Sequence, residues 1–145
     1  MKYILDTDIC IFALKQRMGV LRRLLKESPD DIAVSAMTEA ELVFGALKSS
    51  QPERAGTQVA AFLEPLVILP FDSEAARKHA EIRYALRGNP IGERDMVTAA
   101  VAAASGLALV THNTREFARV EGLVLEDWAE AGGAPPIPSP PEATG

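Results

Sequence analysis

Short apolar runs alternate along the chain with longer segments in which apolar residues recur at helical spacing. Five compact runs predict buried β-strands at residues 2–5, 32–35, 66–71, 107–111 and 123–127. The segments between these runs predict helices at residues 9–16, 18–27, 37–49, 72–87, 94–106 and 114–120, with residues 58–66 inside another. Strands that alternate with helices in this way predict an α/β fold with a central, mainly parallel sheet of about five strands.

Capping residues and composition set the expected boundaries. Asp72 or Ser73 is suited to cap the helix at 72–87, and Gly106 is suited to end the helix at 94–106. After residue 130 the sequence is mainly proline, glycine, alanine and serine, a composition that does not form a packed element. We therefore expect one domain at residues 1–130 and a disordered tail at 131–145.

Composition then narrows the class of protein. The chain has 145 residues, of which 48% are hydrophobic, enough for one domain with an aliphatic core. Its one cysteine, Cys10, excludes an intrachain disulfide and fits a reducing compartment. No stretch approaches the ~18 apolar residues that span a membrane, and the N-terminus lacks the pattern of a signal peptide. These features predict a cytoplasmic protein with no membrane association.

The charge balance is acidic, with a formal net charge of −5. An acidic protein is a poor match for the phosphates of a nucleic acid, unless bound metal ions offset the charge at the site. Basic residues nevertheless cluster in three parts of the chain, and solvated helix faces are the simpler interpretation of them. The clusters comprise Lys15, Arg17, Arg22, Arg23 and Lys26; Arg83, Arg87 and Arg94; and Arg115 and Arg119.

Candidate chemistry lies where predicted strands end and helices begin. Asp6 directly follows the first strand, Glu41 and Asp95 lie in the first turns of two helices, and Asn113 and Glu116 follow the fourth strand. Ligands of open α/β sheets bind beyond the carboxyl ends of the strands. Carboxylates gathered at that edge would repel one another, and divalent cations with oxygen ligands, Mg²⁺ or Mn²⁺, would relieve the repulsion.

Several of these residues also have structural interpretations. Asp8 is interpreted as the N-cap of the following helix rather than as a metal ligand. Thr38 and Glu41 have the spacing of a capping box, which competes equally with a ligand role for Glu41. Asn113 and Glu116 show the same spacing. From spacing alone, Glu41 and Glu116 can therefore be either metal ligands or parts of helix caps.

The structural alternative is weaker for the remaining acidic residues. Asp95 could simply favour the positive end of its helix. Asp6 is the strongest candidate, because a carboxylate that closes a strand has no routine structural function. From spacing alone, a metal site and a set of helix caps remain equally supported.

Other chemistries lack their sequence signatures. The chain contains no GxxxxGK[ST] loop, no GxGxxG fingerprint and no GxSxG elbow. One cysteine and two histidines do not give the spacing of a zinc site. His79 is expected to be a solvated helix residue, and His112 lies next to the proposed site, where a phosphate contact is the less favoured interpretation.

Four blocks of sequence carry a resemblance to a known family: "MKYILDTDICIFALK", "TEAELVFGALKS", "NPIGERDMVTAA" and "LVTHNTREFARVEGLVLEDW". In this order and spacing they resemble the PIN-domain ribonuclease toxins of the VapC type over residues 1–129. The resemblance implies a PIN-like α/β/α sandwich. It also implies an endoribonuclease that depends on Mg²⁺ or Mn²⁺, forms a homodimer and is held inactive by a cognate VapB-like antitoxin.

The resemblance also implies roles for individual residues. It places the acidic residues of the family on Asp6, Glu41 and Asp95, with Asp6 and Asp95 as metal ligands. The fourth acidic position falls on the neutral Asn113, and Glu116 one helical turn later would supply the missing charge. The family's hydroxyl near the last strand corresponds to Thr111, which would orient a carboxylate or a water.

The implied substrate is RNA, with tRNA, and within it initiator tRNA, as the leading candidate. Arg94 and Arg115 neighbour site residues and are the candidates for phosphate contacts. Two other functions stay open at this point. One is a PIN nuclease that processes RNA or DNA without acting as a toxin, and the other is a non-catalytic PIN module that only binds partners.

Overall fold

A computed structural model describes residues 1–130, and the tail predicted at 131–145 lies outside the described residues. Five strands form one sheet in the order β3-β2-β1-β4-β5, and every neighbouring pair is parallel. The strands are β1 Tyr3–Leu5, β2 Ile32–Ser35, β3 Val67–Leu69, β4 Ala108–Val110 and β5 Leu125–Glu126. The expected five-stranded parallel sheet is therefore confirmed.

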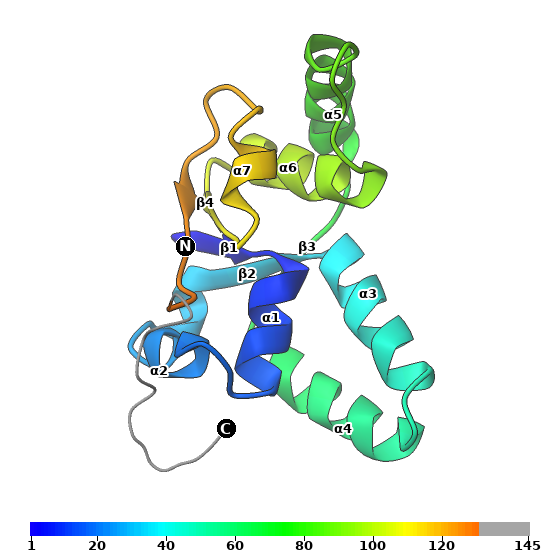
Figure 1. The fold of residues 1–145 in the computed structure, drawn as a ribbon, viewed down its shortest axis with the longest axis vertical. Coiled ribbons are helices and arrows are strands. Elements are labelled where there is room, and N and C mark those ends of the chain that lie inside the picture. The colour runs from blue at the N-terminus through cyan, green and yellow to red at the C-terminus, as the bar shows by residue number, and fades with distance from the viewer. Residues whose placement is uncertain (131–145) are drawn as a thin grey trace.

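Helices cover both faces of this sheet (Figure 1). The chain runs from α1 through α4 on one face, and from α5 through α7 on the other. The helices are α1 Thr7–Leu14, α2 Val20–Leu24, α3 Ala36–Leu47, α4 Pro52–Leu63, α5 Ser73–Ala85, α6 Glu93–Ser105 and α7 Thr114–Phe117, with a 3₁₀ turn at Pro29–Asp31. The arrangement is the predicted α/β/α sandwich.

The central strand explains why the first apolar run has no polar alternation. Ile4 packs in the core beneath α5 to α7, whereas Leu5 packs in the core beneath α1 to α4, and both are fully buried. A parallel strand covered on both faces reads as a continuous apolar run. The core on the second face is filled largely by the alanine-rich α6, whose small side chains allow the helix to approach the sheet closely.

Strand order creates the edge at which a site can form. From β1 the chain adds β2 and then β3 on one side, and later adds β4 and β5 on the other. The carboxyl ends of β1 and β4 therefore flank a topological switch point, where ligands bind in open α/β sheets. Leu5 at the end of β1 pairs with Val110 at the end of β4, so Asp6 and Thr111, which follow them, lie next to each other at the same edge of the sheet.

Helix boundaries differ from the sequence predictions at both starts and ends: the helix predicted at 18–27 is Val20–Leu24, and the one predicted at 114–120 ends at Phe117. The helix predicted at 9–16 is Thr7–Leu14, because Asp6 caps its start, and the helix expected to contain 58–66 is Pro52–Leu63, so residues 64–66 lie outside it. Asp72 rather than Ser73 caps α5, and Gly106 ends α6 with a left-handed φ of 70°. In the described part of the chain, no helix is long and apolar enough to span a membrane.

Candidate active site at the switch point

Asp6 is the most constrained acidic residue of the switch point. It directly follows β1, and its side chain is only 7% exposed. One carboxylate oxygen, Oδ1, accepts a hydrogen bond from the backbone N–H of Thr7 at 2.8 Å, and Oδ2 accepts one from the Thr111 hydroxyl at 2.8 Å. Asp6 therefore caps α1, so the expectation that Asp8 is the cap was wrong, as was the view that Asp6 has no structural function.

Burial makes the charge on Asp6 costly. Desolvation raises the pKa of its carboxyl from 3.8 to about 6, and the nearby charges of Asp8 and Glu41 add to the rise. The hydrogen bonds from Thr111 and Thr7 oppose it only in part. At neutral pH the carboxylate thus lacks sufficient compensation from its protein partners.

Asp95 also carries a costly charge, and it lies on α6, which covers the opposite face of the sheet from α1. It lies in the first turn of α6, and the pKa of its carboxyl is also raised to about 6. Desolvation is the largest cause, followed by the charges of Asp6, Glu116 and Glu41, whereas Arg94 lowers the pKa. The fold therefore brings Asp6, Glu41, Asp95 and Glu116, here called the carboxylate cluster, into electrostatic contact.

Glu41 does not form the capping box that its spacing allowed. Ser35 caps α3 instead, because its hydroxyl accepts from the backbone N–H of Thr38 at 3.1 Å. The Glu41 carboxylate faces the cluster: Oε1 accepts from the Thr7 hydroxyl at 2.6 Å, and Oε2 lies 3.4 Å from Nε of Arg94. The capping interpretation was wrong, since tertiary contacts hold this side chain.

Asn113 and Glu116 lie at the start of α7. Asn113 occupies the N-cap position without a side-chain capping bond, and its backbone N–H donates to the Thr111 hydroxyl at 3.0 Å. Thr111 thereby links Asn113 to Asp6, in agreement with the expectation that this hydroxyl orients a carboxylate. Glu116 contributes charge to the cluster and lies 3.9 Å from Arg119.

Two site features were missed by sequence reasoning. The first is Thr7, whose hydroxyl joins the carboxylate of Glu41 to the neighbouring helix α1. The second is Asp8, whose Oδ2 accepts from the backbone N–H of His112 at 3.1 Å and whose buried Oδ1 has no hydrogen-bond partner among the described residues. Burial raises the pKa of the Asp8 carboxyl. A threonine between two aspartates carries no separate signal in the sequence.

The donor chemistry of the cluster fits a hard divalent cation. All candidate ligands are carboxylate or amide oxygens, which Mg²⁺ and Mn²⁺ prefer. With their side chains as placed, no three histidine, cysteine, aspartate or glutamate residues within 1–130 converge on one point. Instead Arg94 and the threonine hydroxyls partly compensate the charges. The raised pKa values of Asp6 and Asp95 show that this compensation is incomplete.

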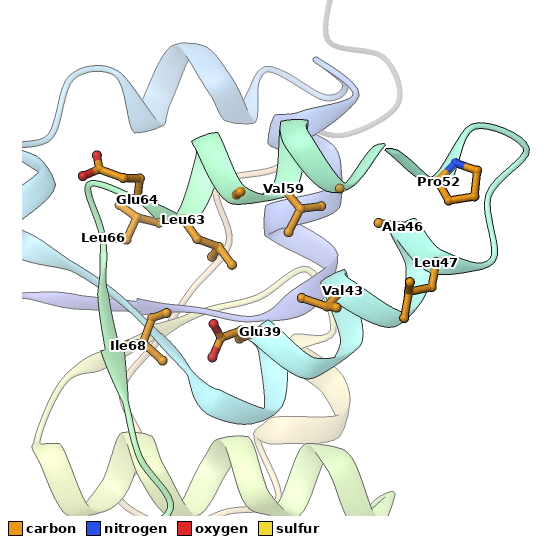
Figure 2. Close-up of a pocket in the computed structure, with 12 residues that line it drawn as sticks. Glu39, Val43, Ala46, Leu47, Pro52, Val59, Leu63, Glu64, Leu66 and Ile68 are labelled. Atoms are coloured by element: carbon orange, nitrogen blue, oxygen red, sulfur yellow. The ribbon is translucent and has the colours of Figure 1, made fainter. Parts of the chain in front are cut away.

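A separate apolar groove lies between α3 and α4 (Figure 2). It has a volume of about 450 Å³ and contains no member of the carboxylate cluster. The exposed side chains of Val43, Leu47 and Ile68 contribute to its wall, so apolar surface faces solvent here. The groove is lined by Glu39, Val43, Ala46, Leu47, Pro52, Gly56, Val59, Ala60, Leu63, Glu64, Leu66 and Ile68.

Comparison with known proteins gives a consistent family assignment. The family model described as the PIN domain matches residues 3–123. A tRNA(fMet)-specific endonuclease VapC of Shigella flexneri is 39% identical over 131 residues, covering 89% of this chain and 99% of the relative. Ribonuclease VapC2 of Haemophilus influenzae is 39% identical over 130 residues, covering 88% and 98%.

Solved structures agree with this assignment. VapBC from Salmonella typhimurium, solved with bound DNA, superposes with a TM-score of 0.84 at 37% identity, covering 89% of this chain and 99% of the other. VapBC2 from Rickettsia felis, bound to a promoter DNA fragment, gives 0.81 at 33% identity, covering 88% and 99%. The matched family range contains the whole carboxylate cluster. The chain belongs to the PIN-domain family and, within it, to the VapC ribonucleases.

Proposed function

We propose that this protein is the toxin of a VapBC-type pair, a Mg²⁺-dependent endoribonuclease that hydrolyses tRNA. The observation that carries the proposal is the carboxylate cluster at the switch point, where the pKa values of Asp6 and Asp95 are both raised to about 6. Such a cluster is poorly compensated by protein groups and suits a divalent cation. Mn²⁺ would substitute, because it takes the same oxygen ligands.

Each residue of the site then has a role. Asp6 and Asp95 would hold the metal ion, with Glu41 and Glu116 binding it directly or through water. When bound, the ion supplies an activated water as nucleophile and stabilises negative charge on the phosphate. Thr111 and Thr7 fix the carboxylates of Asp6 and Glu41 through hydrogen bonds of 2.8 and 2.6 Å. Hydrolysis by water would leave a 5′-phosphate and a 3′-hydroxyl.

Substrate binding would use cations next to the cluster. The Arg94 side chain is 71% exposed although it pairs with Glu41, so it can also reach a phosphate. Arg115 lies in α7 beside Glu116 and is exposed. Contacts of this type position the backbone without reading its sequence, so RNA shape and unpaired loops would select the substrate. The names of the Shigella and Salmonella relatives make initiator tRNA the first candidate.

The partner is a VapB-like antitoxin, and we place the complex in the cytoplasm. Relatives of this chain were solved as VapBC complexes. The apolar groove between α3 and α4 offers surface for such a partner, because Val43 and Leu47 are 43% and 67% exposed. Patches of this kind on soluble proteins mark interaction sites. The homodimer implied by the family resemblance completes the proposed assembly.

The decisive experiment incubates the isolated protein with total tRNA in Mg²⁺ or in EDTA. Asp6→Asn and Asp95→Asn run alongside, and Asp72→Asn serves as the control because Asp72 caps α5 outside the cluster. We expect discrete fragments that require Mg²⁺, persist in Asp72→Asn and disappear in the two cluster variants. No cleavage of any RNA, together with no Mg²⁺ or Mn²⁺ binding by calorimetry, would refute the enzyme and favour the non-catalytic binding module.

A co-expression experiment separates a toxin from a processing nuclease. If the protein is a toxin, co-expression with a VapB-like antitoxin encoded beside it should remove both the cleavage and any growth arrest seen when the protein is expressed alone. Cleavage that is insensitive to any co-encoded partner would favour the processing nuclease.

A further inference from the structure

Tyr84 and Arg87 form a stacked pair at the C-terminal end of α5. The guanidinium carbon of Arg87 lies 3.9 Å from the centroid of the Tyr84 ring, and Tyr84 is 68% exposed. Nη1 of Arg87 also donates to the backbone carbonyl of Tyr84 at 2.7 Å. Because this hydrogen bond and the cation–π contact hold the guanidinium against the ring, the pair has a fixed orientation although it faces solvent.

The surface around this pair is positively charged. Arg83 and Arg87 are exposed, and in the described part of the chain neither forms an ion pair with a carboxylate. Glu81, in the preceding turn of α5, lies 3.8 Å from Lys78, which offsets its charge. Together with Arg94, the two arginines are the second basic cluster of the sequence. Their charge contrasts with the net charge of −5 and favours an anionic partner here.

An anchored segment joins this surface to the carboxylate cluster. Residues 86–92 run from the end of α5 to the start of α6, whose first turn carries Asp95. Nη1 of Arg119, just after α7, donates to the backbone carbonyls of Asn89 and Pro90 at 3.4 and 3.1 Å. In addition, α5 packs against α6 and projects beyond it at one end of the molecule (Figure 1). The stacked pair therefore has a defined position relative to the cluster.

An exposed ring with a cation stacked on it matches the parts of one nucleotide. In the described part of the chain, Tyr84 has no other aromatic or cationic ring partner, so the rest of the ring is open to a planar base. The free N–H groups of Arg87 can donate to a neighbouring phosphate. A second copy of this chain fits less well, because a two-fold axis at this surface would bring the same arginines together.

We propose that Tyr84, supported by Arg87, stacks on an unpaired base of the RNA substrate at a nucleotide away from the cleaved phosphate. The inference rests on the proposed function and deepens it, because it names a residue that selects RNA with an unpaired loop. Bases in a duplex are already stacked on their neighbours, whereas a loop base can turn out to the protein. Every base has a planar face, so the contact selects unpaired RNA rather than a sequence.

The test uses a synthetic RNA hairpin that spans the cleavage site mapped on total tRNA, with one loop nucleotide at a time made abasic. Removing a base deletes its stacking face and keeps the phosphates. Binding is measured by fluorescence anisotropy in EDTA, where the proposed hydrolysis is blocked, and kcat/KM is measured in Mg²⁺. Wild type is compared with Tyr84→Ala, Tyr84→Trp and Arg87→Gln.

Phe44→Ala is the matched control. Phe44 is also an exposed aromatic residue, at 60%, and Nζ of Lys48 lies 5.3 Å from its ring centroid. It belongs to α3 rather than to α5. Phe44→Ala therefore removes a similar ring from a different surface, and it should match wild type on every hairpin.

We expect Tyr84→Ala to bind the intact hairpin about 5- to 50-fold more weakly, the size of one base–aromatic stack, with a similar loss in kcat/KM. One abasic hairpin should show the same loss with wild type and no further loss with Tyr84→Ala, as in a double-mutant cycle. Tyr84→Trp keeps a planar ring and should bind like wild type. Arg87→Gln should reduce the slope of log Kd against log salt by about 0.7, whereas Tyr84→Ala should leave that slope unchanged.

The outcomes separate this inference from the proposed function. If Tyr84→Ala binds and cleaves like wild type, or loses the same factor on every abasic hairpin, the stacking contact is overturned while the ribonuclease stands. A changed molecular mass of Tyr84→Ala in light scattering would assign the ring to a contact between subunits and would also overturn it. If melting curves show that Tyr84→Ala does not fold, Tyr84→Leu, which keeps apolar bulk without a planar face, decides in its place. A wild-type protein that neither binds nor cleaves RNA overturns both proposals.

Discussion

Replacing Asp6 by asparagine should make the metal-free protein more stable, although it removes the central acidic group. The pKa of the Asp6 carboxyl rises from 3.8 in an unfolded chain to about 6 in the fold. This rise corresponds to about 3 kcal/mol of folding free energy lost when the group is ionised at neutral pH. Asparagine has nearly the same shape and removes that cost.

Part of the gain is offset by weaker hydrogen bonds. The asparagine amide can still accept from the backbone N–H of Thr7, but it must then present its NH₂ group to Thr111, which currently donates to Asp6. Exchanging charge-assisted bonds for neutral ones costs about 1 kcal/mol. The net expectation at pH 7.5 is that Asp6→Asn raises the free energy of unfolding by about 2 kcal/mol.

The sign of the pH dependence follows from the direction of the shift. Because the folded-state pKa of Asp6 is raised, the folded protein binds more protons than the unfolded chain between pH 3.8 and about 6. The contribution of this group to stability is therefore present at low pH and is lost as pH rises through about 6. Asp95 acts in the same direction, because its pKa is also raised to about 6.

Urea unfolding in EDTA at pH 4.5 and pH 7.5 measures this prediction. The stability difference between Asp6→Asn and wild type should be small at pH 4.5 and should grow to about 2 kcal/mol at pH 7.5. Asp72→Asn makes the same chemical change at the cap of α5, and its difference should stay within about 0.5 kcal/mol at both pH values. A variant that is less stable than wild type at pH 7.5 would refute the reasoning. In saturating Mg²⁺ the order should reverse, because only wild type gains stability from the bound ion.

Three further predictions test neighbouring parts of the molecule. Arg94→Gln removes the cation that lies 3.4 Å from Glu41, so calorimetry should show Mg²⁺ binding about two- to tenfold more tightly. Unchanged affinity would mean that Arg94 does not compete with Mg²⁺ for the Glu41 carboxylate. Thr111→Val removes the hydroxyl that orients Asp6, so kcat for tRNA cleavage should fall about 10- to 100-fold. A change in KM alone would show that Thr111 does not orient the Asp6 carboxylate for catalysis. Leu47→Glu places a charge on a side chain that is 67% exposed in the groove; antitoxin affinity should fall at least about tenfold with tRNA cleavage unchanged.

Local sequence information was sufficient for the elements and the fold class. The runs at 32–35 and 107–111 are apolar up to their last residues, Ser35 and Thr111, because strands buried on both faces have no polar side to present. The Ala-rich segment at 94–106 and Gly106 show a helix and its end with equal clarity. The family resemblance placed Asp6, Glu41 and Asp95 in one site, and the fold brings their charges together with that of Glu116.

Local patterns could not decide what individual polar side chains do. The Thr38–Glu41 spacing satisfies a capping box, yet Ser35 caps α3 and Glu41 bonds to Thr7, a residue 34 positions away in the chain. Asp8 was predicted as the N-cap of α1, but Asp6 occupies that position, and the Asp8 carboxylate instead accepts from the backbone N–H of His112, 104 positions away. In each case a distant partner competes with a local one, and local spacing contains no information on distant partners.

By itself, the sequence determined which segments are strands and helices and which acidic residues follow them, since these depend on side-chain spacing and on local capping. Tertiary structure alone decided that β1 and β4 lie side by side, because strand order is set by the packing of helices on two faces. That adjacency joins Thr111 to Asp6, and it raises the pKa values of Asp6 and Asp95 by burying their charges together. The contact of 2.9 Å between Nδ1 of His112 and Oδ2 of Asp127 also depends on strand order, because β4 and β5 end next to each other at the edge of the sheet.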